Sequence, residues 1–399
     1  MEARADAARA SLRDANRIVI KIGTNTIMRR KASGALASGP ASGRSREGGI
    51  DVEFLHRIAA QVASLARAGK QVIVVTSGAI GMGARELGIA KRVTELRMRQ
   101  ACAAIGQIAL MDEYRRAFGV YDLVPAQLLV TRDAWDGRSA YLNLRASVET
   151  LLEAGAIPVF NENDVVSTAE IGNAFGDNDQ LSAYVASKAD AELLIILSDV
   201  SALFDADPRV NPEARPIPYV GELSPGIIAA AGGAGTEFST GGMATKLKAV
   251  SIAGDAGCRV VIADGRESDV IERIMSGEAI GTLFDAGHAL KNRQRWIKNS
   301  RTLGCLAIDE GAFAAIRARN SLMPRGVLSV EGRFDRGDIL LVKVASSKQG
   351  VAKVVTNFST AEIELALGKR SEDLEALLGP TAPKVIARPD ETVFLDAND

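Results

Sequence analysis

The chain has 399 residues, which is more than one ordinary domain holds and predicts two. Its content of 47% hydrophobic and 24% charged residues is typical of a globular protein with a buried core. A formal net charge of −1 excludes general attraction to nucleic acid or an anionic membrane, although a local basic patch stays open. Three scattered cysteines favour a reducing compartment, and no apolar run approaches the ~20 residues that span a bilayer. We therefore expect a cytoplasmic protein.

The first strand is expected at residues 17–22, after a charged segment at residues 1–16 that we interpret as a solvated extension. Lys21 lies at the end of this strand, before Gly23 and small hydroxyl residues. In such a loop, backbone N–H groups can bind phosphate, although a lysine at a strand end is more often simply solvated. Residues 31–49 are rich in Gly, Ala and Ser and predict a flexible insertion, which is either inert or a lid.

A second polar loop, residues 76–83, follows a strand predicted at residues 71–75. Its Ser77 and Gly78 offer free N–H groups to an anion, but glycines required for close packing explain the loop equally well. The other elements expected before residue 155 are helices at residues 51–68, 94–118 and 139–153 and a strand within residues 120–129.

Residues 157–209 contain the strongest functional signal. Two continuous apolar runs, residues 157–160 and 193–197, predict buried parallel strands, with a helix at residues 180–190 between them. Each strand ends directly in a polar cluster, and a further cluster precedes the helix. Loops at the carboxyl ends of parallel strands form the ligand crevice, so these clusters should converge as a substrate floor. Ordinary turn and helix-cap chemistry is the alternative.

A later segment, residues 236–246, leads into a further helix, and its small residues with Lys246 at the helix start predict a second phosphate site. Strands are expected at residues 259–263 and 280–284. Beyond a basic segment around Trp296, short strands at residues 326–332, 337–345 and 350–355 predict a small β-rich module.

Six motifs, in order, carry a resemblance to a known family: KIGTNTI, VTSGAIGMG, FNENDVVSTAEI, FGDNDQLSA, LSDVSALFDADPR and STGGMATKLKAV. Together they resemble the amino acid kinase family. The segments RQRWI, AIDEGAFAAI and NSLMPRGVLSVEGRFDRGDILL resemble a PUA domain. The implied fold is α/β: an open, mainly parallel sheet sandwiched by helices, followed by a small β-rich PUA-like domain. The expected boundaries are 1–16 for the extension, 17–286 for the kinase domain with the insertion at 31–49, and 291–390 for the PUA-like domain.

The resemblance implies transfer of the γ-phosphoryl group of ATP, with Mg²⁺, to the side-chain carboxylate of L-glutamate, the first step of proline biosynthesis. It also implies inhibition by proline, a homo-oligomer, and delivery of the product to glutamate-5-semialdehyde dehydrogenase. The chemistry agrees with the residues, because a carboxylate with a solution pKa of ~4.3 is already ionised and needs no general base. Neither His56 nor His288 lies in a motif.

The resemblance also implies roles for individual residues. Lys21 and Lys246 would supply the catalytic cations and Asp179 would orient them. Gly23 and Gly78 would let backbone N–H groups approach the phosphates and the carboxylate. The implied glutamate-binding residues are Ser77, Gly78, Asp164, Asp177 and Asn178. The implied ATP-binding residues are Lys21, Gly23, Ser198, Asp199, Thr240, Gly241, Gly242, Met243, Ala244, Thr245 and Lys246.

Two alternatives remain. Another small-molecule kinase of this fold, acting on acetylglutamate, aspartate, carbamate or UMP, is the nearer one, and the paired NEND and GDND clusters argue against it. The other is an RNA-binding protein with an inactive kinase domain, based on the basic segment at residues 293–301 and the PUA resemblance. Lysines and aspartates retained at every active position argue against that alternative.

Overall fold

The computed structural model divides into two compact units, Met1–Ala289 and Leu290–Asp399. It describes residues 2–28, 49–131, 138–166, 178–224, 226–228, 242–287, 289–347, 349–369 and 373–395. The expected insertion at residues 31–49 therefore lies outside the described residues except for Gly49. None of the helices in the described ranges is both long and apolar enough to cross a membrane.

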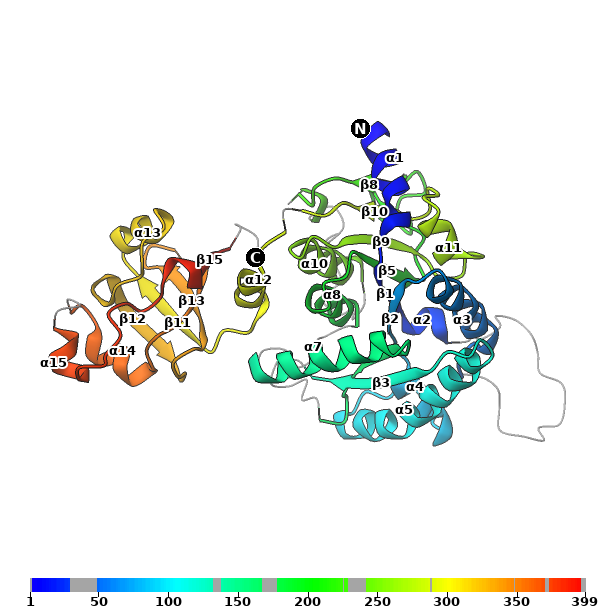
Figure 1. The fold of residues 1–399 in the computed structure, drawn as a ribbon, viewed down its shortest axis with the longest axis horizontal. Helices are drawn as coiled ribbons and strands as arrows, with labels where there is room; N and C mark the ends of the chain where they lie inside the picture. Colours follow the sequence, from blue (N-terminus) through cyan, green and yellow to red (C-terminus); the bar gives the residue numbers. More distant parts are fainter. Residues whose placement is uncertain are drawn as a thin grey trace. The chain divides into compact units, whose positions relative to one another are not determined.

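The first unit is built on an eight-stranded sheet (Figure 1). Its strands are, in spatial order, β3 (Pro125–Val130), β4 (Ile157–Glu162), β2 (Gln71–Val75), β1 (Arg17–Ile22), β5 (Leu193–Ser198), β9 (Arg259–Asp264), β10 (Thr282–Phe284) and β8 (Tyr219–Val220). The six strands from β3 to β9 run parallel, and β10 is antiparallel to β9. A separate short pair joins β6 (Leu203–Phe204) to β7 (Pro216–Ile217).

Helices cover both faces of this sheet, so its central strands are buried on both sides (Figure 1). One face packs against α3 (Val52–Arg67), α4 (Ala79–Glu86), α5 (Leu96–Gly119) and α11 (Val270–Met275). The other face packs against α7 (Arg138–Glu153), α8 (Asn178–Lys188) and α10 (Met243–Gly254). The expected α/β fold with helices on both faces is confirmed.

The alternation of β1 decides where its lysine lies. Ile18, Ile20 and Ile22 point into the core under α3 and α5, whereas Val19 points into the core under α8 and α10. Successive side chains of a strand point to opposite faces, so Lys21 shares the face of Val19. The lysine is therefore directed toward α8 and α10 at the carboxyl end of the strand.

The N-terminal segment is a docked element, so the expectation of a solvated extension is wrong. Its residues form α1 (Glu2–Ala10) and a 3-10 turn (Ser11–Asp14). Leu12 is fully buried, and Arg9 is only 4% exposed. The Arg9 guanidinium donates to four main-chain carbonyls, those of Pro218, Glu278, Ile280 and Gly281. A cation with this many carbonyl acceptors can be buried, which composition alone does not reveal.

The second unit is a five-stranded sheet flanked by helices. In spatial order its strands are β12 (Val327–Gly332), β11 (Gly304–Ile308), β13 (Ile339–Val344), β14 (Gly350–Val355) and β15 (Thr392–Phe394). Its helices are α12 (Asn292–Asn299), α13 (Glu310–Arg317), α14 (Thr360–Ala366) and α15 (Leu374–Leu378), of which α13, α14 and α15 pack on the main core. The strand β11, which pairs with both β12 and β13, was not predicted from the sequence.

Candidate active site

The centre of the candidate site is one carboxylate held by two lysines. Asp179, in the first turn of α8, is fully buried, and Lys21 and Lys246 are each only 4% exposed. Lys21 Nζ forms an ion pair with Asp179 Oδ1, and Lys246 Nζ bonds to Asp179 Oδ2 over 3.0 Å. The three catalytic residues implied by the resemblance are thus brought together at the carboxyl end of β1.

This arrangement fixes the charge of the cluster. Burial alone would raise the pKa of Asp179, but the two lysines outweigh that effect and lower its pKa to about 2. Asp179 is therefore ionised at neutral pH, and the three side chains together carry a net charge of +1. A buried net positive charge is costly unless an anion neutralises it. The cluster is thus suited to an anionic ligand.

Two loops border the cluster. The N–H of Gly23 donates to the carbonyl of Leu197 over 3.1 Å, so it is not available to a ligand. Gly23 instead leaves room, because a Cβ there would lie 3.3 Å from Lys21 Nζ. On the other loop, Gly242 is the N-cap of α10 and Met243, Ala244 and Thr245 form its first turn. The N–H groups of a first helical turn, including those of Met243 and Ala244, suit phosphate binding.

The end of β5 supplies a second carboxylate. Asp199 accepts hydrogen bonds from Asn25 Nδ2 at 3.0 Å and from Ser198 Oγ at 3.2 Å. Burial would raise the pKa of Asp199, but these hydrogen bonds lower it below its usual range. Asp199 is thus an exposed, ionised acceptor next to the cluster. Asn25 was not predicted, although it lies within the first motif.

A chain of side-chain amides connects the loops on the other side. Asn178 Nδ2 lies 2.6 Å from the Thr76 carbonyl oxygen, 2.9 Å from Ser77 Oγ and 2.9 Å from Asn161 Oδ1. Because its two hydrogens are shared among these three acceptors, Asn178 presents only Oδ1, an acceptor, to a ligand. Ser77 Oγ accepts from Asn178, so its own hydroxyl hydrogen is directed elsewhere. Ser77 and Asn178, two of the residues that the resemblance implies for glutamate binding, are therefore in direct contact.

The glycines of residues 76–83 were explained either by a binding loop or by close packing, and the structure shows a glycine of each kind. Gly78 is the N-cap of α4 with a φ of 107°, a left-handed conformation that favours glycine. Gly83, in contrast, permits packing: a Cβ there would lie 1.8 Å from the carbonyl oxygen of Cys102 on α5. The first glycine therefore shapes the site, and the second lets α5 approach α4.

A hollow lies between the end of β4 and helices α4 and α5. Its walls include Asp164, Glu162, Ala79 and Gln107. Burial, and then the neighbouring Glu162, raise the pKa of Asp164 to about 6, although Arg99 opposes them. A raised carboxylate pKa indicates a site that gains from a cation. Asn161 belongs to the polar cluster expected after the strand at residues 157–160, whereas Gln107 was not predicted, because a single amide in a helix gives no sequence signal.

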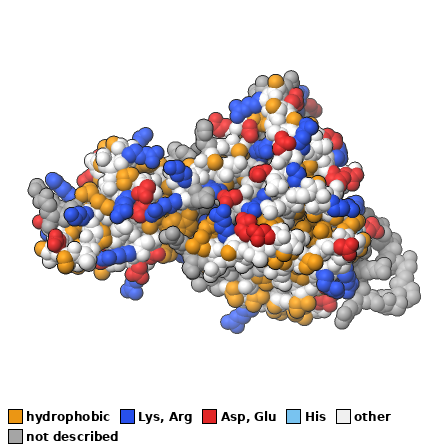
Figure 2. Space-filling model, in the orientation of Figure 1, with side chains coloured by type: hydrophobic (Ala, Val, Ile, Leu, Met, Phe, Trp, Pro, Cys, Tyr) orange, Lys and Arg blue, Asp and Glu red, His pale blue; other side chains and the backbone are white. Residues whose placement is uncertain are grey.

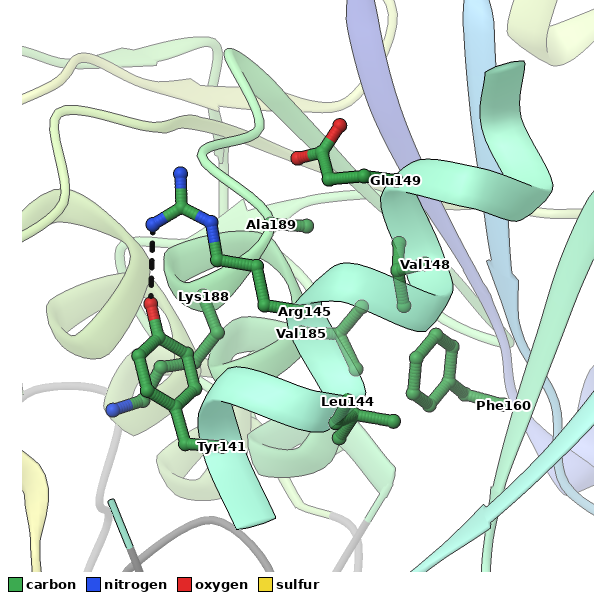
Figure 3. Close-up of a pocket in the computed structure, with 9 residues that line it drawn as sticks. All are labelled: Tyr141, Leu144, Arg145, Val148, Glu149, Phe160, Val185, Lys188 and Ala189. Atoms are coloured by element: carbon green, nitrogen blue, oxygen red, sulfur yellow. Dashed lines mark hydrogen bonds between the residues drawn. The ribbon is translucent and has the colours of Figure 1, made fainter. Parts of the chain in front are cut away.

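Three predicted residues, Asp177, Thr240 and Gly241, lie outside the described residues. A second hollow, shown in Figure 3, lies between α7 and α8 and contains none of the predicted site residues. Its floor is apolar, with Phe160 and Val185, and Arg145 on its rim donates to the Tyr141 hydroxyl over 3.4 Å. The described site residues therefore lie at the strand ends and not in this hollow.

A parallel sheet with buried lysines at the carboxyl ends of its strands defines a class of α/β proteins that bind an anion in the crevice there. The profile of the amino acid kinase family matches residues 16–264, and that of the PUA domain matches residues 304–378. The chain belongs to the amino acid kinase family.

Curated relatives are similar along nearly their whole length. Glutamate 5-kinase of Methanosarcina mazei is 47% identical over 370 residues, which cover 92% of this chain and 93% of the relative. Glutamate 5-kinase of Caldanaerobacter subterraneus subsp. tengcongensis is 39% identical over 386 residues, covering 96% and 99%. Glutamate 5-kinase of Geobacter sulfurreducens is 41% identical over 382 residues, covering 95% and 97%. The similarity therefore extends over both units.

Proposed function

We propose that this chain is a glutamate 5-kinase, which transfers the γ-phosphoryl group of ATP to the side-chain carboxylate of L-glutamate. The observation that carries the proposal is the buried Lys21–Asp179–Lys246 cluster with its net positive charge. Phosphoryl transfer between two anions requires fixed cations more than it requires a base. The names of the relatives supply the acceptor, and the neighbouring hollow with Asp164 suits the ammonium group of an amino acid.

The reaction itself makes limited demands on the protein. The side-chain carboxylate is ionised at neutral pH, so its oxygen attacks the γ-phosphorus without prior proton removal. The bond from that oxygen to phosphorus forms while the bond from phosphorus to the bridging oxygen breaks, and ADP leaves. Lys21 and Lys246 neutralise charge on the transferring group, because both ammonium groups are fixed by Asp179 before the substrates bind.

The residues present also suit a nucleotide. The first turn of α10 supplies N–H groups for phosphate, and Asp199 supplies an ionised acceptor beside it. When bound, Mg²⁺ would supply positive charge that reduces the repulsion between the two anions. Of the residues described, Asp199 is the carboxylate that we expect to support the ion, since Asp179 is engaged by two lysines.

The alternative of an RNA-binding protein is less well supported. In the basic segment, Arg293 pairs with Glu391 over 2.6 Å, and Arg295 is only 8% exposed. Both side chains serve the packing of α12 within the second unit. On the face drawn in Figure 2, basic and acidic side chains are interspersed over both units. Such a surface gives little of the attraction on which nucleic-acid binding depends.

The direct test is formation of an acyl phosphate. The full-length protein is incubated with ATP, Mg²⁺ and L-glutamate, ADP release is followed, and the acyl phosphate is trapped as a hydroxamate with hydroxylamine. We expect both products with L-glutamate and neither with acetylglutamate, aspartate, carbamate or UMP. ADP release with one of these acceptors in place of glutamate would refute the proposal and identify the other kinase.

A pair of lysine variants connects the reaction to the proposed site. Lys246→Ala removes a buried cation, and we expect kcat to fall by roughly a hundred-fold or more, since fixed charges of this kind contribute several kcal/mol. Lys70→Ala is the control, because among the described residues the Lys70 ammonium group bonds to the carbonyl of Arg13, which is not a site residue. Near-normal turnover of Lys246→Ala with saturating substrates would exclude its role in phosphate transfer.

A further inference from the structure

The side-chain amides of Asn178, Asn161 and Gln107 form a chain of hydrogen bonds. Two main-chain groups determine which end of each amide donates and which accepts. The carbonyl of Thr76 can only accept, so the group of Asn178 that faces it at 2.6 Å is the NH₂. The N–H of Glu162 can only donate, so the atom of Asn161 that faces it at 2.9 Å is the oxygen. Asn161 therefore points its NH₂ group, Nδ2, at the remaining amide in the chain, which belongs to Gln107.

Gln107 is consequently oriented as well. Its Oε1 accepts from Asn161 Nδ2 over 2.9 Å, which places its own NH₂ group at the free end of the chain. Gln107 is only 8% exposed, and its Nε2 has no hydrogen-bond partner among the described residues. A buried donor without an acceptor is destabilising, so an acceptor is expected there when the site is filled.

The packing of α5 explains why this amide lies at the site. Gly106 is the residue before it, and a Cβ at Gly106 would lie 1.8 Å from the carbonyl oxygen of Ala79. Only glycine lets α5 approach the first residue of α4 so closely. As a result Gln107 and Ala79 both line the hollow that contains Asp164 and Glu162.

We propose that the Nε2 group of Gln107 donates a hydrogen bond to the α-carboxylate of bound L-glutamate, and so selects an α-amino acid as the acceptor. This inference rests on the proposed kinase activity and extends it. Within the hollow, Asp164 provides the anion for the α-ammonium group. The α-carboxylate is attached to the same carbon as that ammonium group and must lie beside it.

The other carboxylate of glutamate is a less suitable partner for Gln107. The side-chain carboxylate has to reach the γ-phosphoryl group at Lys21 and Lys246 to react. Asn178 lies on that route and offers only an acceptor atom, and the Ser77 hydroxyl is the donor beside it. The amide chain thus places one donor, Ser77, toward the reacting end and another, Gln107, toward the α-carbon end.

The test is Gln107→Glu in the full-length protein at pH 8. This change keeps an oxygen that accepts from Asn161 and replaces only the donor with a second oxygen. We expect KM for L-glutamate to rise by roughly ten-fold or more, while KM for ATP changes by less than about three-fold. If Gln107 only positions Asn161, the variant keeps its KM for glutamate, and that result would overturn the proposal.

A matched control is available on another helix. Gln61 on α3 is 4% exposed, and both ends of its amide are bonded, to the N–H of Ile271 and the carbonyl of Arg57. Gln61→Glu should lower the thermal midpoint and leave KM for glutamate unchanged. A rise in KM for Gln61→Glu equal to that for Gln107→Glu would also refute a direct contact, since it would attribute the effect to the fold.

The ligand group is identified with 4-aminobutyrate, which lacks the α-carboxylate but keeps the amine and the reacting carboxylate. It is assayed as an inhibitor of glutamate phosphorylation and as a substrate. Gln107→Glu should weaken glutamate about ten-fold and 4-aminobutyrate less than three-fold. Equal losses for both compounds would overturn the proposal. A wild-type enzyme that does not phosphorylate glutamate would refute the proposed function instead, together with this extension of it.

Discussion

Lys246 Nζ bonds to Asp179 Oδ2 over 3.0 Å and thereby joins the first turn of α10 to the first turn of α8. Because the Lys21 side chain holds the other oxygen, the same carboxylate also ties both helices to the end of β1. One buried anion therefore organises two cations that approach from different elements. The cations are fixed before any ligand arrives, which is the condition under which electrostatic stabilisation is most effective.

The variant Asp179→Asn should lose both stability and activity. It leaves two lysines buried without their anion, and breaking a buried ion pair in this way costs about 3–5 kcal/mol. We expect a corresponding loss in the free energy of unfolding by urea, and a severe loss of kcat. The matched control is Asp190→Asn, which removes a half-exposed pair with Arg145 and should cost less than about 1 kcal/mol.

The same carboxylate predicts the acid limit of stability. Its folded pKa of about 2 lies below the unfolded value of ~3.9, so its contribution is complete above pH ~4 and is lost as the pH falls toward 2. Asp179→Asn should flatten the stability curve in that window. An unchanged slope between pH 4 and 2 in the variant would mean that other carboxylates dominate acid unfolding.

How far the sequence predicted the site depends on the kind of signal each residue gives. Lys21 and Lys246 stand at the ends of recognisable elements, and strand alternation then determines the face of Lys21. Gln107 could not be found in this way. A glutamine in a long helix ordinarily lies at the surface, and this one is buried only because Gly106 admits the backbone of α4. That contact depends on tertiary packing, which residue spacing does not encode.

The fold shows the same contrast between features that local residue patterns predict and features that depend on tertiary contacts. Continuous apolar runs identified β1, β2, β4 and β5 nearly to the residue, because strands buried on both faces need such runs. The docking of the N-terminal segment was missed. Its charged composition is typical of solvated chain, and the carbonyls that accept from Arg9 belong to irregular segments far along the sequence. Main-chain carbonyls in irregular segments give no recognisable pattern in the sequence.

The docking of the N-terminal segment through Arg9 leads to a further prediction about stability. Arg9→Met removes the guanidinium donor from four carbonyls, of which those of Pro218 and Glu278 still accept from the N–H groups of Leu283 and Ile280. We expect the free energy of unfolding to fall by about 2–4 kcal/mol. Activity of the folded protein should persist, because none of the Arg9 contacts involves a site residue. Arg13→Met is the control, since Arg13 is exposed and its side chain bonds to the nearby carbonyl of Ala10. Equal melting temperatures for the two variants would contradict the anchoring role.

The pH dependence of substrate binding should follow Asp164. Burial raises the pKa of Asp164 to about 6, so the carboxylate becomes protonated as the pH falls from 7 to 5 and no longer pairs with an ammonium group. We expect KM for glutamate to rise up to about ten-fold per pH unit below 6, with little change in KM for ATP. In Asp164→Asn this dependence should disappear, and its persistence would assign the titration to another group.

A chain that ends at Ala289 should remain a kinase. Every site residue that the structure describes lies in the first unit, Met1–Ala289, which has its own hydrophobic cores on both faces of the sheet. We expect kcat within about three-fold of the full-length value, because none of the residues placed at the reacting groups is removed. A soluble, folded truncation without turnover would show that the second unit completes the active site.

The last prediction concerns proline, the end product of the pathway that the proposed reaction opens. Proline and glutamate share an α-carboxylate and a cationic nitrogen. Asp164 can pair with the nitrogen of either compound, and Asn178 Oδ1 can accept from it, whereas the donor of Gln107 suits the carboxylate. Proline has no side-chain carboxylate, so it would fill the pocket without reacting. We therefore predict that proline competes with glutamate and not with ATP.

Three measurements decide between a shared pocket and a separate proline site on the second unit. Proline titrations at several glutamate concentrations should raise the apparent KM for glutamate and leave the maximal rate unchanged. Asp164→Ala should weaken proline inhibition and glutamate binding by similar factors, because one carboxylate serves both nitrogens. The chain ending at Ala289 should keep its sensitivity to proline. Inhibition that saturating glutamate cannot relieve, or that vanishes with the second unit, would place the inhibitor elsewhere and end the shared-pocket account.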